Sequence, residues 1–199
     1  VSSCEVVEGP YQNEINNNGS SETVLQKILI EDFTGHTCMN CPDAATELES
    51  IKEWYPNQVI GIALHVGNTF ARPLPPNSSN KYLTDFRTQW GEEIDSYFEV
   101  SSVGLPKGMI NRKDEEPKSK DDWGNVVSEI INNSPLFDID ISASPFVFGN
   151  CDIEVLVKAL ENIDGEYNIV IAITEDSIVD WQKNGTYDDS VYVHNHVLR

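Results

Sequence analysis

The stretch VLQKILIEDFTGHTCMNCP, residues 24–42, constrains the architecture most strongly because it places two cysteines three positions apart, between an apolar run and an amphipathic run. Branched apolar residues predict a strand over 24–33, and apolar side chains at helical spacing predict a helix over 42–54. Cys38 and Cys41 are therefore expected at a helix N-terminus. The free backbone N–H groups and the helix dipole there favour an anion, which lowers the pKa of a thiol and favours redox chemistry.

The composition limits the classes of protein to which this chain can belong. The chain has 199 residues with 39% hydrophobic content, enough for one well-buried core. Its 13 lysine and arginine residues against 33 acidic residues give a formal charge of -20, which opposes binding to nucleic acid and to anionic lipid surfaces. No stretch approaches the roughly 18 consecutive apolar residues of a membrane-spanning helix. We therefore expect a soluble, strongly acidic domain.

The first residues, VSSCE, are similar to the end of a bacterial lipoprotein signal, in which small residues precede a cysteine that becomes lipidated. Cys4 is then the candidate lipidation site, and the alternative is a surface cysteine near the terminus. Residues 1–22 are polar and contain no lysine or arginine, so we expect a flexible tether. Four cysteines allow three full pairings, of which only Cys38 with Cys41 is supported by local spacing, and Cys151 is expected to be a small core or half-buried residue.

Residues 23–134 are predicted to form the first folded domain. Strands over 24–33 and 59–66 flank the helix over 42–54, an order that predicts a parallel pair with a right-handed crossover. The further elements expected here are an irregular insertion over 68–80, a helix over 82–98, a loop and short strand over 103–112, and a helix over 122–132.

Residues 135–199 show a different pattern. Strands are predicted over 137–142, 151–159 and 167–173, with a turn at Asp164-Gly165. Alternation of apolar and polar residues in the first of them is typical of antiparallel sheet with one solvated face. We expect a β-rich region resembling part of a sandwich. Because the chain stops at Arg199 with no turn signal, we expect this region to be truncated.

The segment before the cysteines is similar to the thioredoxin superfamily, where an Asp-Phe pair stands six and five residues ahead of the first cysteine, as Asp32 and Phe33 do here. The resemblance implies an α/β thioredoxin-like domain in which Asp32 accepts the proton of Cys41. Gly104-Leu105-Pro106 resembles the cis-proline loop of the superfamily. By that resemblance Pro106 lies against the dithiol and Leu105 presents its backbone to a substrate peptide.

Residues 31–42, 106–112 and 192–199 resemble the outer-membrane-protein-twenty-eight-related lipoprotein family more specifically. The resemblance implies a bacterial cell-envelope lipoprotein, anchored to the outer membrane through lipid on Cys4. It also implies a thioredoxin-like domain followed by a β-rich region.

Two features distinguish the motif from working thioredoxins. Thr37 replaces the expected tryptophan, and Met39-Asn40 replace the usual Gly-Pro, so the resemblance implies no direction of electron flow. Carboxylates near the dithiol, among them Glu31, oppose thiolate formation. A protonated His36 would counter them, which makes His36 and Thr37 candidate modulating residues.

Three functions follow. The first is a thiol-disulfide oxidoreductase without a cofactor, in which Cys38 attacks a protein disulfide, Cys41 resolves the mixed disulfide and Asp32 takes the proton; a static structural disulfide is its alternative. The second is a non-enzymatic surface or periplasmic lipoprotein that uses the domain as a scaffold for binding protein or glycan. The third is copper(I) or zinc binding by His36 with the two cysteines, or by His194 and His196, although neither set supplies four ligands.

Overall fold

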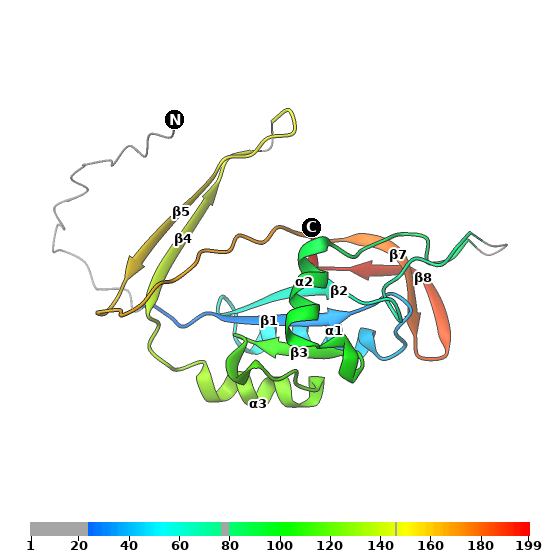
Figure 1. The fold of residues 1–199 in the computed structure, drawn as a ribbon, viewed down its shortest axis with the longest axis horizontal. Coiled ribbons are helices and arrows are strands. Elements are labelled where there is room, and N and C mark those ends of the chain that lie inside the picture. The colour runs from blue at the N-terminus through cyan, green and yellow to red at the C-terminus, as the bar shows by residue number, and fades with distance from the viewer. Residues whose placement is uncertain (1–23, 77–79, 146) are drawn as a thin grey trace.

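The computed structural model describes residues 24–76, 80–145 and 147–199 (Figure 1). The predicted tether over 1–22 and the candidate lipidation site Cys4 lie outside these residues. A five-stranded mixed sheet organises the molecule. Its strands lie in the order β3 (Lys107–Ile110), β1 (Ile28–Thr34), β2 (Val59–His65), β9 (Val197–Leu198) and β6 (Thr174–Glu175).

The first βαβ unit is confirmed. Strand β1 pairs in parallel with β2, and helix α1 (Cys41–Trp54) joins them, beginning one residue earlier than predicted. Strand β1 is buried along almost its whole length because β3 pairs with its other edge in the antiparallel sense. The dithiol motif therefore follows an interior strand of the sheet, whose backbone is held by hydrogen bonds on both sides.

The helices cover opposite faces of the sheet. Ile28 and Ile30 of β1 pack with residues of α1 and of α3 (Lys120–Ile130), whereas Phe33 packs in a second cluster on the face covered by α2 (Gln89–Phe98). Two short 3-10 helices, η1 (Ser101–Val103) and η2 (Lys113–Glu115), flank β3. The two faces of β1 thus pack against two separate clusters of the core.

Helix α2 is shorter than the predicted helix over 82–98. It starts at Gln89 because Thr88 is its N-cap, with Oγ1 accepting a hydrogen bond from the Gly91 amide. The aromatic residues Tyr82 and Phe86 of the predicted helix are buried all the same, in irregular chain. The four-residue spacing of Phe86, Trp90, Ile94 and Phe98 predicted the helix. The last three of these residues lie in α2, whereas Phe86 precedes it.

The chain after residue 135 begins with a hairpin of β4 (Phe137–Ala143) and β5 (Ile153–Ala159), which extends away from the sheet in Figure 1. Its paired residues are largely exposed, including Ile139 and Ile141. The predicted strand over 167–173 is wrong, because that segment is extended but has no strand partner within the described residues.

The final segments return to the main sheet. Strands β7 (Ile178–Asn184) and β8 (Tyr187–His194) form a second hairpin, β9 adds to β2 in parallel with Ala63 opposite Val197, and β6 pairs with β9. The strands predicted over 137–142 and 151–159 therefore form the first hairpin, whereas the second hairpin and the edge of the main sheet are built from later strands that were not predicted. Burial of Val197 and Leu198 against the core accounts for this return.

Candidate redox site at the start of the first helix

Cys38 and Cys41 form a disulfide with 5.4 Å between their Cα atoms, as the C-x-x-C spacing predicted. Cys38 lies in the turn after β1, and Cys41 is the first residue of α1, followed by Pro42 in the first helical turn. Both cysteines are only 2% exposed. Cys151 is half-buried and forms no disulfide with another described cysteine. The site is thus a buried disulfide at a helix N-terminus.

The hairpin of β7 and β8 holds one side of the disulfide loop. The amides of Lys183 and Gly185 donate to the carbonyls of His36 and Met39, at 2.7 and 2.9 Å. Gln182, itself buried, donates its side-chain amide to the carbonyl of Cys38 at 3.0 Å. These contacts explain the low exposure of the disulfide.

The other side of the loop packs against residues of the insertion that follows β2. Thr37 donates both its amide and its hydroxyl to the carbonyl of Phe70, at 3.0 and 2.9 Å. Gly35 is required for this approach, because a Cβ atom there would lie 2.5 Å from the Phe70 carbonyl. Thr37 therefore fixes the position of the loop.

Asp32 is buried in β1, 2% exposed, and its Oδ1 has no hydrogen-bond partner within the described residues. Burial raises the pKa of Asp32 to about 8, since the charged form would lose its hydration. At pH 7 the carboxyl is mostly neutral and carries a proton. A buried carboxyl with this pKa is suited to exchanging a proton with a neighbouring thiol.

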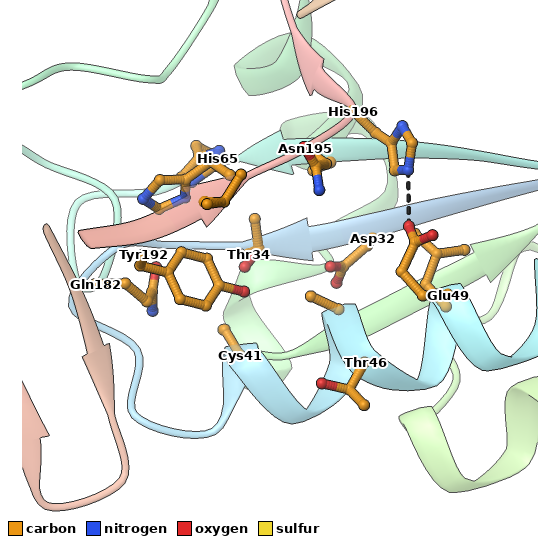
Figure 2. Close-up of a pocket in the computed structure, with 15 residues that line it drawn as sticks. Asp32, Thr34, Cys41, Thr46, Glu49, His65, Gln182, Tyr192, Asn195 and His196 are labelled. Atoms are coloured by element: carbon orange, nitrogen blue, oxygen red, sulfur yellow. Dashed lines mark hydrogen bonds and ion pairs between the residues drawn. The ribbon is translucent and has the colours of Figure 1, made fainter. Parts of the chain in front are cut away.

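Asp32 and Cys41 line the same cleft, which has a volume of about 410 Å³ (Figure 2). Its walls come from β1, β2, α1 and the β7–β8 hairpin with the residues that follow it. Besides these two residues it is lined by Thr34, Ala45, Thr46, Leu48, Glu49, Ala63, His65, Gln182, Tyr192, Val193, His194, Asn195 and His196. Cys38 is absent from this lining, so the cleft meets the disulfide at Cys41.

The buried histidines are neutral. Burial lowers the pKa of His36, so the predicted countering charge from a protonated His36 is wrong. Burial also lowers the pKa of His65 well below its usual value and that of His194 to about 4. His65 and His194 pack on the ring of Phe86, with ring centroids 4.9 and 4.8 Å away. These side chains serve as uncharged, mostly apolar packing elements.

The two histidines predicted as a possible metal pair lie in different surroundings. His194 is buried against Phe86, whereas the ring nitrogens of His196 lie 2.8 Å from Glu49 and 3.0 Å from Asp176. Across the described ranges no group of three or more His, Cys, Asp or Glu side chains could hold a metal ion.

The predicted crowding of the dithiol by carboxylates is reduced at Glu31. Arg112 donates two hydrogen bonds to that carboxylate, at 2.7 and 2.8 Å, in the fork geometry that guanidinium favours. The Glu31 side chain is buried, so this ion pair neutralises the acidic group nearest to Asp32 in the sequence.

The peptide bond between Leu105 and Pro106 is cis, in agreement with the predicted loop type. Strand β3 begins directly after it, with Lys107 opposite Phe33 of β1. The Leu105 side chain packs against the core cluster of Phe33 and Leu64.

The sequence pointed to the cysteines, Asp32 and Thr37 but not to the residues that close the site. Leu105 and Pro106, predicted to bind a substrate peptide, are not among the residues that line the cleft. His65, Gln182 and Tyr192 lie 33 to 160 positions from Asp32 along the chain, and no local motif marks them. Of the other lining residues, His194 and His196 were singled out, for a metal role that the structure does not favour.

No protein-family model matches this chain. A search of curated proteins likewise gives no match. Among solved structures, protein AGR_C_4864 from Agrobacterium tumefaciens is 14% identical, with 89% of this chain and 72% of that chain covered and a TM-score of 0.45. In the described part of the chain, none of the helices has the length and apolar character needed to cross a membrane.

Proposed function

We propose that the protein is a thiol-disulfide redox protein whose working group is the Cys38–Cys41 pair. The observation that carries the proposal is the juxtaposition of a disulfide at a helix N-terminus with a buried, protonated carboxyl in the same cleft. The helix N-terminus stabilises a thiolate formed on reduction. The βαβ unit around the motif and the cis peptide bond before β3 support a thioredoxin-like arrangement.

Asp32 moves the proton. When the disulfide is reduced, two thiols replace one S–S bond and two protons are taken up. Asp32 is protonated below about pH 8 and can deliver one of them to the Cys41 thiolate. In the oxidising direction the same carboxylate accepts the proton of Cys41. The proposal extends to protein thiols or disulfides as partners, as the superfamily resemblance implies.

The reduction potential of the pair tests this function. The protein is equilibrated in dithiothreitol redox buffers, and free thiols are counted by alkylation and mass spectrometry. A redox-active pair is expected to have a potential above about −300 mV, since structural disulfides lie below that value. A lower potential, or no turnover above the Cys38→Ser background in insulin reduction and in refolding of a scrambled substrate, contradicts the proposal.

We further propose an outer-membrane, lipid-anchored location with the lipid on Cys4, on the strength of the family resemblance alone. Expression of the chain behind a lipoprotein signal, with metabolic labelling by a fatty-acid analogue, tests it. Label is expected on the protein and absent from Cys4→Ala. Equal labelling of both contradicts the proposal.

A second candidate function, a binding scaffold without catalysis, is favoured by the β4–β5 hairpin. In the register of this hairpin Ile139 faces Val157 and Ile141 faces Val155, so apolar side chains line one face. Ile139 and Ile141 are exposed, as are Ile169 and Ile171 of the extended segment beside them in a shallow groove. Binding of a protein or glycan that survives Cys38→Ala together with Cys41→Ala, but is lost on Ile141→Asp, would support this role.

A further inference from the structure

The β7–β8 hairpin and the cleft meet the disulfide loop in different ways. The hairpin occupies the loop carbonyls of His36, Cys38 and Met39, and the sulfur atoms belong to residues that are 2% exposed. The cleft, one wall of which comes from the same hairpin, is lined by Cys41 and Asp32. A small molecule can therefore approach Cys41 through the cleft without displacing the hairpin.

The size of the cleft fits a small ligand. Its volume of about 410 Å³ lies at the lower end of the range of small-molecule sites. It is lined by several polar side chains, and Figure 2 shows Asp32, Tyr192 and Gln182 around the approach to Cys41. The buried Oδ1 of Asp32 and both ring nitrogens of His65 have no hydrogen-bond partner within the described residues. Buried polar atoms without partners raise the free energy of the folded state, and these atoms belong to side chains that line the cleft.

The charge of the cleft suits a thiolate. Asp32, His65 and His194 are all mostly uncharged near pH 7, because burial disfavours their charged forms. At the rim, Glu49 is paired with His196 at 2.8 Å and with Lys52 at 3.1 Å, so its charge is compensated. Tyr192 keeps its proton, since burial raises its pKa to about 12. An incoming thiolate therefore meets no uncompensated carboxylate on the way to Cys41.

We propose that this cleft binds a low-molecular-weight thiol, of the size of cysteamine or cysteine, which reduces the disulfide by attacking Sγ of Cys41. The inference rests on the proposed redox function and specifies its reductant. It also reverses the order expected from the sequence, in which Cys38 is the residue that exchanges with the partner.

The chemistry balances with two equivalents of thiol. The first thiolate forms a bond to Cys41 Sγ and breaks the S–S bond, whose electron pair goes to Cys38 Sγ at the helix N-terminus, where it takes a proton from solvent. A second thiolate attacks the sulfur of the bound thiol, releasing the small disulfide and the Cys41 thiolate, which takes the proton of Asp32. Asp32 then regains a proton from solvent, so the protein gains two protons in all, equal to the two lost when the thiols ionise.

The position of the first adduct tests the proposal. The oxidised protein is mixed with cysteamine, quenched in acid at short times, digested and analysed by mass spectrometry. Cysteamine is expected on Cys41. An adduct found mainly on Cys38 overturns the proposal even where the disulfide is reduced.

A cleft-filling variant gives an independent readout. Ala45 lines the cleft from α1, and Ala45→Phe is expected to slow reduction by cysteamine about tenfold, because the thiol loses its positioned approach. Glu53→Phe, on the exposed side of the same helix, is the matched control and is expected to leave the rate unchanged. Circular dichroism checks that both are folded, and Thr46→Phe replaces Ala45→Phe if the latter is not.

The outcomes separate the two proposals. Unchanged reduction rates in folded Ala45→Phe and Thr46→Phe overturn the cleft as the route, while the redox function stands. If neither cysteamine nor dithiothreitol reduces the disulfide of the folded protein, the redox function itself fails, and the inference fails with it.

Discussion

Gln182 donates its side-chain amide to the backbone carbonyl of Cys38 at 3.0 Å, although 144 residues separate the two in the sequence. The same amide also lies 3.3 Å from the carbonyl of Gly35 and 3.0 Å from that of Lys183. One buried side chain thus joins the disulfide loop to the β7–β8 hairpin. The environment of the dithiol therefore depends on a contact between an early and a late segment of the described chain.

Removing this link is expected to expose Cys38. Gln182→Ala leaves the carbonyls of Gly35 and Cys38 without their shared donor, which costs about 1–3 kcal/mol of folding free energy. We expect reduction of the disulfide by a protein dithiol to become faster as the hairpin loosens. Urea unfolding and stopped-flow reduction measure the two effects. Val191→Ala, at an exposed position of the same hairpin, is the control, and equal behaviour of the two variants would contradict the assigned role.

The Asp32 carboxyl makes stability fall as pH rises. Its pKa is about 8 in the folded protein against a usual value of 3.8, so the folded state holds the proton more tightly than the unfolded state. This contribution is complete below about pH 4, is lost progressively up to about pH 8 and is constant above it. Asp32→Asn removes the dependence. The free energy of unfolding of Asp32→Asn, measured with urea and taken relative to the wild type, is expected to rise with pH in that window by up to about 1.4 kcal/mol per pH unit.

A pH-independent difference between the two proteins would show that Asp32 titrates normally. The variant also separates stability from redox function. Although more stable at high pH, it is expected to exchange thiol and disulfide more slowly, because Asn has no proton to give to Cys41.

His194 acts in the opposite pH direction. Burial lowers its pKa to about 4, so the unfolded state binds the proton more tightly and stability is lost as pH falls from about 6.5 to about 4. His194→Phe keeps an aromatic ring against Phe86 and removes the titration. Its free energy of unfolding, relative to the wild type, is expected to rise by about 1–2 kcal/mol between pH 7.5 and pH 5. A relative value that stays flat over this range would rule out His194 as the titrating group.

Two glycines, one in β3 and one in α3, test the packing around α3. A Cβ atom at Gly108 would lie 2.4 to 2.6 Å from the indole ring of Trp123, which is fully buried, so Gly108→Ala is expected to destabilise the fold by about 1–3 kcal/mol. At Gly124 the nearest atom is 3.5 Å away, on Trp54, and the residue lies inside α3. Gly124→Ala is therefore expected to stabilise by about 0.5–1 kcal/mol. Thermal unfolding of both variants gives the comparison, and equal midpoints would contradict this packing.

Local sequence was sufficient for the first βαβ unit and for the dithiol. The apolar run of β1, the helical spacing of α1 and the position of Asp32 are all contained in 31 consecutive residues, from Val24 to Trp54. Their structure depends on neighbours in the chain, which a pattern can report.

The closing half of the site could not be predicted in the same way. A strand was predicted over 167–173, but local sequence does not show whether a hydrogen-bonding partner exists. The partner of β2 is Val197, and the cover of Cys38 is Gln182; both contacts depend on how distant segments meet. The predicted helix included Phe86 because of its spacing from later apolar residues. Phe86 is nevertheless buried outside the helix, since an aromatic residue can be buried without being helical.

The pairing of β9 with β2 also has a consequence for synthesis of the chain. Ala63 pairs with Val197, so 133 further residues must be synthesised after Ala63 before its partner residue is made. A nascent chain that already contains the dithiol motif still has an open strand edge at β2, and the hairpin that covers Cys38 has not yet been translated. Cys38 and Cys41 are therefore expected to be most accessible to oxidants during synthesis of the chain, and to become enclosed only after β7, β8 and β9 have been added.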